Sequence, residues 1–294
     1  KVLNRIHRVG NGPGEYKDIG SIDVNPANGE LYLKEMNRQQ IHVYSLDGKF
    51  KHSFTFPEGK RMSRMCLFSP DYLIAEQESK VPDDQDANFY PYLLVSTRDG
   101  HLDSLDYVQK RNILVKLIVN AENHSYAYLL EPSLIRNGSR FYIGNPDSDT
   151  LFAMNPDRTL EPLLVRTPSH SEEGNKYGLF LRGAAGAYFF LTKQPMEVPM
   201  NSIESLDLKS EEWLYDCRTQ EVCRYLLKNK DDASKRVEGI MFFCYPEDCG
   251  LAVLKSEDLM DAYEAGQLSG ELKEIAAGLK ADDNPVLMLI HFKK

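Results

Sequence analysis

The sequence predicts an all-β fold, a β-propeller built from four-stranded antiparallel blades. Short runs of β-branched and aromatic residues alternate with polar residues and are bounded by Gly, Asp, Asn and Pro, a pattern typical of antiparallel strands joined by turns. These runs recur in groups of four. Because one four-stranded group cannot bury both of its faces alone, the groups must stack around an axis, and we expect residues 1–294 to form a single domain.

The first group of strands lies within residues 21–56. Its runs cover residues 21–24, 30–33, 40–44 and 50–56, and Leu46-Asp47-Gly48-Lys49 separates the last two. An Asp-Gly pair between two alternating runs is a strong hairpin signal, because Gly tolerates the positive φ that a tight turn requires. This segment therefore predicts a complete blade.

Three further groups repeat the pattern. Their runs cover residues 65–68, 72–75, 92–95 and 101–107, then 133–135, 141–143, 151–154 and 160–165, then 178–181, 187–191, 212–215 and 224–227. The outer hairpin turns fall near residues 47, 99, 157 and 219, which are 52, 58 and 62 residues apart. This regular spacing predicts successive blades. The run 113–119 is also strand-like but fits none of these groups.

A fifth group with a helical insertion closes the chain. Residues 239–243 and 250–254 predict strands, residues 256–279 a helix broken near Gly266 or Gly270, and residues 285–292 a final strand. We expect Val2–Val9 to pair with this final strand, since pairing the two ends of the chain would close the ring and leave no strand edge exposed. This reading gives five blades.

Charge and hydropathy restrict the partners. Lys and Arg number 35 and Asp and Glu 44, so the net charge of −9 argues against a nucleic-acid partner, which is captured by neutralising phosphates. No apolar run approaches the roughly 20 residues that a transmembrane helix needs. Because the chain begins at Lys1 without a Met, we expect a processed or trimmed amino terminus.

The cysteines leave two interpretations open. Cys217 and Cys223 flank one turn sequence, and Cys244 and Cys249 flank another, so each pair could form a disulfide across a hairpin, with Cys66 left over. The alternative is five buried thiols that pack as small hydrophobes. Neither pair has zinc-finger spacing, and the seven histidines show no metal-ligand spacing, although His42 and His52 on adjacent strands could face each other. We therefore expect no metal and no cofactor.

Aromatic residues in loops are the candidate ligand-binding residues. Phe89, Tyr90 and Tyr92 follow an acidic loop, and Tyr177 adjoins the loop 167–176. They could line one mouth of the propeller and stack on a sugar or a peptide, whereas aromatics at strand positions more often pack between blades.

The segment Gly10-Asn11-Gly12-Pro13-Gly14-Glu15-Tyr16, together with Leu46-Asp47-Gly48-Lys49-Phe50 and the final Asp282-Asp283-Asn284-Pro285-Val286-Leu287, resembles a family of six-bladed β-propellers from Bacteroidetes that are similar to NHL and TolB propellers. The resemblance implies six blades, although five can be counted. It also implies export to the periplasm or cell surface, often as a lipoprotein whose lipid anchor would lie upstream of this chain, which agrees with disulfides. The glycines of the first motif suit a turn between blades better than a phosphate loop, because Pro13 lacks a donor and no helix follows.

Two functions remain open. The first is a non-catalytic binding or scaffolding propeller of the cell envelope for glycan or protein ligands, because propellers present loop-built surfaces and no catalytic motif is present. The alternative is a carbohydrate-active lyase or hydrolase with channel-facing carboxylates. Its sign would be two carboxyl groups about 5–9.5 Å apart, one with a raised pKa.

Overall fold

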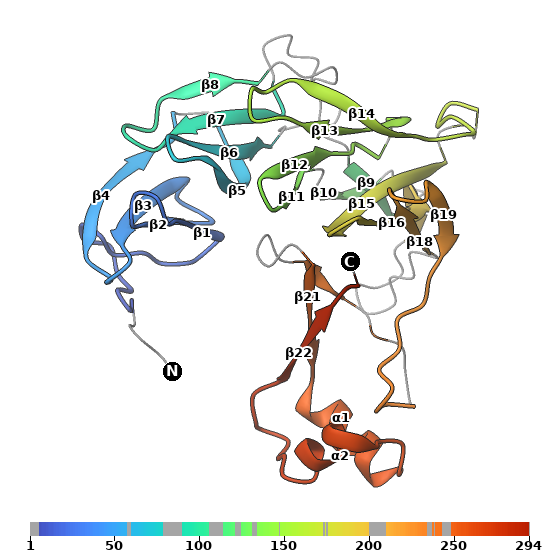
Figure 1. Cartoon of the computed structure of the whole chain (residues 1–294). Helices are drawn as coiled ribbons and strands as arrows, with labels where there is room; N and C mark the ends of the chain where they lie inside the picture. Colours follow the sequence, from blue (N-terminus) through green and yellow to red (C-terminus); the bar gives the residue numbers. More distant parts are fainter. Residues whose placement is uncertain are drawn as a thin grey trace. The chain divides into compact units, whose positions relative to one another are not determined.

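The computed structural model describes residues 6–57, 60–78, 90–105, 114–120, 125–130, 134–146, 148–172, 174, 176–199, 210–233, 237, 239–242 and 248–293. These residues form two compact units, one of Lys1–Leu114 with Pro156–Thr159 and one of Val115–Asn155 with Leu160–Lys294. The predicted fold class is confirmed: the chain is all-β, with propeller blades of consecutive antiparallel strands and two short helices among the described residues (Figure 1). A single domain of residues 1–294 stays a prediction.

The first unit contains two four-stranded blades. In each one the strands pair in chain order, which is the up-and-down meander that the alternating runs predict. The first blade consists of β1 (Ser21–Asn25), β2 (Glu30–Lys34), β3 (Gln40–Ser45) and β4 (Phe50–Thr55). The second consists of β5 (Met62–Ser69), β6 (Tyr72–Gln77), β7 (Tyr92–Ser96) and β8 (Leu102–Ser104).

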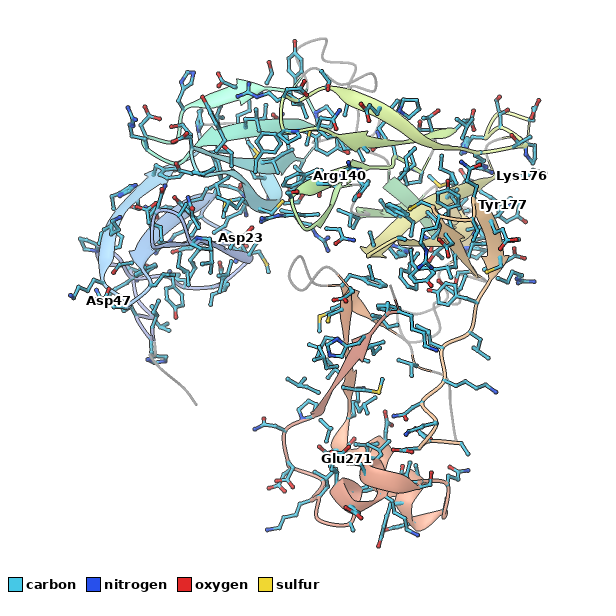
Figure 2. All side chains as sticks on the ribbon, viewed as in Figure 1. Asp23, Asp47, Arg140, Lys176, Tyr177 and Glu271 are labelled. Atoms are coloured by element: carbon cyan, nitrogen blue, oxygen red, sulfur yellow. The ribbon has the colours of Figure 1, made fainter. Side chains whose placement is uncertain are left out.

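Two contacts hold these blades together. The inner strands β1 and β5 are neighbours, and Asp23 of β1, labelled in Figure 2, accepts a hydrogen bond of 2.6 Å from the Leu67 N–H of β5. Between the blades lies a buried apolar cluster from both sheets, which includes Tyr32, Ile41 and Val43 of the first and Leu73 and Val95 of the second. Stacking therefore buries the face that one blade alone would expose.

The second unit contains three blades. The first consists of β11 (Leu134–Asn137), β12 (Arg140–Ile143), β13 (Thr150–Met154) and β14 (Leu160–Val165). The next consists of β15 (Tyr177–Ala185), β16 (Tyr188–Pro195), β18 (Glu211–Asp216) and β19 (Glu221–Arg224). The last has three described strands, β20 (Met241–Phe242), β21 (Cys249–Leu254) and β22 (Val286–His291). Here too the first strands of successive blades are neighbours, β11 beside β15 and β15 beside β20.

The strand-like run 113–119 belongs to a sheet of a different kind. It forms β9 (Leu114–Asn120), which pairs with β10 (Ser125–Leu130) and runs parallel to β17 (Glu197–Pro199). A parallel pair between strands so far apart in the sequence is not a meander. The sixth blade implied by the resemblance is therefore not among the described residues, which form five blades and this extra sheet.

The helical insertion is confirmed, and it connects β21 to β22. Helix α1 spans Ser256–Glu264 and α2 spans Gly270–Ala276, with the predicted break between them at Gly266, whose φ is +68°. Each helix is too short to be stable alone, and the pair buries its own apolar cluster against the ends of the two strands. The members of this cluster are Leu254, Leu259, Ala262, Leu268, Leu272, Ala276, Leu279 and Val286.

The predicted pairing of Val2–Val9 with the final strand stays a prediction. The final strand β22 pairs with β21, because the helical insertion brings the chain back beside it. Residues 1–5 lie outside the described residues, and the segment that follows them contacts the first blade. Ile6 packs against a buried cluster with Leu33 and Tyr44, and Val9 forms a bridge with Tyr16. Ile6 is partly buried and Val9 is exposed.

Candidate functional site

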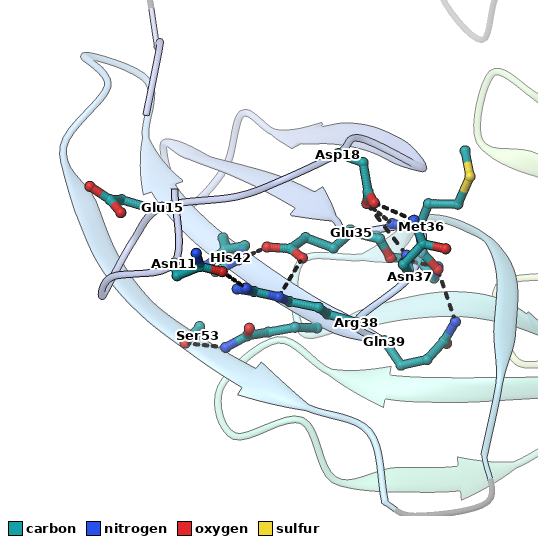
Figure 3. Close-up of polar contacts among 12 residues, drawn as sticks. Asn11, Glu15, Asp18, Glu35, Met36, Asn37, Arg38, Gln39, His42 and Ser53 are labelled. Atoms are coloured by element: carbon teal, nitrogen blue, oxygen red, sulfur yellow. Dashed lines mark hydrogen bonds and ion pairs between the residues drawn. The ribbon is translucent and has the colours of Figure 1, made fainter. Parts of the chain in front are cut away.

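The turn between β2 and β3 in the first blade is held in one conformation by a neighbouring carboxylate. Asp18 Oδ1 accepts hydrogen bonds from the backbone N–H groups of Met36 at 2.7 Å and Asn37 at 3.4 Å, and its Oδ2 accepts one from the Asn37 amide at 2.5 Å (Figure 3). Partial desolvation of Asp18 acts to raise its pKa, but these hydrogen bonds outweigh it, and the pKa of Asp18 lies below its usual value.

Gln39 fixes the other side of this turn. Its φ of 51° reverses the chain, and its backbone carbonyl accepts a hydrogen bond of 3.1 Å from the Phe56 N–H. Its side-chain oxygen accepts a hydrogen bond of 2.7 Å from the Met62 N–H, and its Nε2 donates to the Met36 carbonyl at 3.2 Å. The turn is thus tied to the second blade and to itself.

A buried acid–base pair lies beneath the turn. The Glu35 side chain is 0% exposed, and its Oε1 lies 3.0 Å from Nε2 of His42, whose side chain is 3% exposed. Glu35 Oε2 lies 3.6 Å from Arg38 Nε, and among the described residues neither this oxygen nor His42 Nδ1 has a hydrogen-bond partner. A buried polar atom without a hydrogen-bond partner reduces the stability of the folded protein. The pair of Glu35 and His42 is therefore an unusual feature at this end of the blade.

Two cations flank Glu35. Lys34 is buried, its Nζ donates to the Glu35 carbonyl at 3.0 Å, and burial lowers its pKa despite the nearby Glu78 and Asp18 carboxylates. Arg38 is one-third exposed at its side chain and donates a hydrogen bond to the Asn11 side-chain oxygen (Figure 3). Arg38 therefore connects the buried carboxylate to the surface.

The exposed part of this site offers hydrogen-bonding groups on a fixed backbone. Asn11, Met36 and Asn37 are exposed, and Met36 is 56% exposed. Asn11 and Asn37 can each donate and accept hydrogen bonds. The pKa is lowered at several described carboxyl groups, which include Asp18, Glu30, Asp47, Asp99, Asp157 and Asp216.

The motif 10–16 forms the loop that leads to this site. The Gly12 N–H donates to Glu15 Oε2 at 2.8 Å, the Gly10 N–H donates to the Tyr16 carbonyl at 3.1 Å, and the Tyr44 hydroxyl donates to the Gly14 carbonyl at 2.9 Å. A Cβ at Gly10 would lie 2.0 Å from Glu15 Oε2, so the glycine leaves room for that carboxylate. Pro13 is exposed, and the loop folds on its own side chains, as expected for a turn before a blade.

The aromatic residues predicted to bind ligand lie in different surroundings. Phe89 lies outside the described residues. Tyr90 is partly buried against the apolar cluster between the first two blades, and Tyr92 is 0% exposed in β7. Tyr177, labelled in Figure 2, is 40% exposed at the start of β15, and Lys193 lies 5.1 Å from its ring centre. Of the described three, Tyr177 alone presents an exposed ring, and a stacking role stays a prediction for it.

Two expectations about paired side chains need correction. His42 and His52 do not face each other, because His42 pairs with Ser53 and His52 with Val43, so successive positions put them on opposite faces of the sheet.

The thiols of Cys217 and Cys223 are free. Cys223 lies opposite Leu214, three positions and about 10 Å along the strand from Cys217, too far for a disulfide.

Of the remaining cysteines, Cys249 is a buried free thiol and Cys66 is partly buried. Cys244 lies outside the described residues, and so does its predicted disulfide with Cys249.

Comparison with known proteins places the chain in a family. Residues 1–291 match DUF4934, described as a domain of unknown function. The chain belongs to the DUF4934 family. A comparison with curated proteins gave no match. Neither described helix is long and apolar enough to cross a membrane.

Solved structures resemble this DUF4934 chain in fold. One is described as a "Putative exported protein" from Bacteroides fragilis NCTC 9343, with 15% sequence identity, a TM-score of 0.68, and coverage of 99% of this chain and 82% of that one. Another is a member of the DUF4221 family from Bacteroides vulgatus ATCC 8482, with 8% identity, a TM-score of 0.51, and coverage of 98% and 83%. At these identities the likeness shows the fold alone.

The buried pair of Glu35 and His42 was not predicted from the sequence. The available signal was the position of Glu35, which directly follows the alternating run of β2 and precedes a turn. A carboxylate in that position is typical of a solvated turn, and its burial depends on tertiary packing that a local pattern does not show.

Proposed function

We propose that this DUF4934 chain is a non-catalytic, exported binding or scaffolding propeller of the cell envelope that holds a polar ligand, a glycan or a peptide, at the turn between β2 and β3. The observation that carries the proposal is the turn itself, in which exposed polar side chains stand on a backbone fixed by Asp18 and Gln39. A fixed backbone favours binding because little conformational entropy is lost when the ligand docks.

The chemistry of the turn suits a neutral or mixed polar ligand. Asn11 and Asn37 each carry both a donor and an acceptor, and Arg38 adds a planar set of donors. Hydroxyl groups of a sugar and amide groups of a peptide match such a mixture. The loop-built ends of propeller blades are where ligands of this family of folds are expected to bind.

The state of Asp18 favours a binding role for this turn. Acid catalysis by a lyase or hydrolase needs one carboxyl group with a raised pKa. The pKa of Asp18 is lowered, so this group is anionic at neutral pH and acts as a hydrogen-bond acceptor.

Export is supported by the Bacteroides fragilis protein of the same fold, which is described as a "Putative exported protein". We place the chain in the periplasm or at the cell surface, with a lipid anchor upstream of residue 1 as the means of attachment. Fractionation of the native host, with and without detergent extraction, tests this location. Recovery in the cytoplasmic fraction would contradict it.

The ligand is found by screening the purified chain against arrays of glycans and of peptides, and the site is tested with the Asn37→Ala, Arg38→Ala double variant. We expect the variant to lose at least about tenfold in affinity, equivalent to about 1.4 kcal/mol. The matched control is Asp47→Ala with Lys49→Ala, an exposed charged pair in the turn at the other end of β3. Equal affinity of the double variant and wild type would contradict the site, and cleavage of the ligand during binding would favour the enzyme.

A further inference from the structure

Three side chains of the types that commonly bind metal ions lie close together at one end of the last blade. Cys249 is the first residue of β21 and follows Asp248 directly, while His291 is the last residue of β22. In the antiparallel ladder Cys249 lies directly opposite His291, so the two side chains project from the same face of the sheet. Residues 42 positions apart in the sequence therefore come together.

The spacing of the three donor atoms fits a tetrahedral metal ion. Cys249 Sγ lies 3.1 Å from His291 Nδ1 and 3.7 Å from Asp248 Oδ1, and the three donor atoms lie within 4.8 Å of one another. With Zn–S near 2.3 Å and Zn–N or Zn–O near 2.1 Å, two ligand atoms of a tetrahedral zinc ion lie about 3.6 Å apart. The donors thus occupy the positions of such ligands with little movement.

The backbone around the three residues is fixed by strand pairing. Six consecutive residues of β21 pair with six of β22, from Cys249 opposite His291 to Leu254 opposite Val286. Beyond the Cys249–His291 pair, the Phe292 N–H donates to the Asp248 carbonyl at 2.8 Å. Asp248 is therefore held beside the ladder rather than in a free loop, and the site is built before any ligand arrives.

We propose that Asp248, Cys249 and His291 form a binding site for Zn²⁺. Thiolate and imidazole ligands favour zinc over Mg²⁺ or Ca²⁺, which prefer oxygen ligands. Because the Cys249 thiol is buried and the His291 side chain is exposed, the ion would lie at the surface of the blade with solvent within reach. Three protein ligands leave the fourth position of the ion for water or for an external donor.

The test uses the full chain without an affinity tag, reduced with a metal-free reductant and stripped with a chelator. Titration with Zn²⁺ is followed by calorimetry, and titration with Co²⁺ by the thiolate-to-cobalt charge-transfer absorption. We expect saturable binding with that absorption band. The His291→Ala variant changes an exposed residue, so it should fold normally, and we expect it to lose at least about tenfold in affinity.

The matched control is His101→Ala, which removes an exposed histidine whose Nε2 lies 3.5 Å from Asp103 Oδ1 with no thiol in the pair. It should bind zinc as the wild type does, and circular dichroism confirms the fold of both variants. Wild-type affinity in His291→Ala, or cobalt binding without the charge-transfer band, would overturn the proposal. So would a disulfide between Cys249 and Cys244, detected by peptide mapping of the protein before reduction.

Discussion

At the scale of single residues, the loop 10–16 depends on a glycine at position 14. Gly14 has a φ of +69°, and a Cβ there would lie 2.4 Å from Cγ of Phe50. Phe50 packs edge-on against Tyr44, with ring centres 5.8 Å apart, and the hydroxyl of Tyr44 donates back to the Gly14 carbonyl. The glycine, the ring and the hydroxyl hold the loop against the first blade.

We expect Gly14→Ala to destabilise the protein more than Gly29→Ala. Both residues have a positive φ, which costs an alanine about 1–2 kcal/mol, but nothing lies within 4 Å of a Cβ at Gly29. At Gly14 the displacement of Phe50 adds about 1–3 kcal/mol. The difference between the urea unfolding midpoints of the two variants measures the cost of displacing Phe50. Equal midpoints would show that Phe50 moves away freely.

Single residues also show which features can be predicted from the sequence and which cannot. The glycine motif could be interpreted as a turn because glycine spacing and Pro13 act locally. The burial of Glu35 and His42 could not be predicted, because it depends on tertiary packing that a local pattern does not show. Tyr92 was expected in a binding surface and is a core residue, since an aromatic at the start of a strand can face either way.

At the scale of elements, the β18–β19 hairpin is stabilised by a charged contact across its turn. Arg218 donates to both Asp216 carboxylate oxygens, at 3.0 Å and 2.7 Å, and to the Tyr188 hydroxyl at 2.5 Å. The side-chain hydrogen bond from Arg218 is the largest cause that lowers the pKa of Asp216 to about 2. Because the folded-state pKa is below the unfolded value, the stabilisation is present above about pH 4 and is lost as the pH falls through 2.

Removing Arg218 should return the pKa of Asp216 toward its ordinary value. In Arg218→Ala we expect the pKa of Asp216 to increase from about 2 toward 3.8, as measured by NMR titration of the carboxyl carbon. The control is Arg224→Ala in the same hairpin, which removes a guanidinium whose Nη2 lies 3.6 Å from Glu211 Oε1. An unchanged Asp216 pKa in Arg218→Ala would show that the backbone hydrogen bonds of the turn are sufficient to lower the pKa of Asp216.

Elements follow from the sequence where their partners are local. The four-stranded groups were predicted because each strand pairs with the next one along the chain. The pairing of β9 with β17 was not predicted, because it joins two strands that are far apart in the sequence. Local patterns carry no information about such partners.

At the scale of the whole molecule, the proposed export has to be reconciled with the exposed free thiols of Cys217 and Cys223. Exported proteins occupy oxidising compartments in which neighbouring thiols form disulfides. Cys217 and Cys223 are both exposed, yet their offset along the hairpin prevents them from pairing with each other. An exported chain with this hairpin must therefore either keep two reactive thiols or join them to other molecules.

We expect Cys217 and Cys223 to react rapidly with a maleimide in the native protein, while Cys249 reacts only after unfolding, because its side chain is buried. Peptide mass spectrometry of the labelled native protein identifies the sites. The Cys217→Ser and Cys223→Ser variants, each labelled at the remaining residue, serve as controls. An internal disulfide in the peptide that contains both residues, in protein purified from the periplasm, would contradict the strand register, since closing that bond requires the hairpin to shift by several positions.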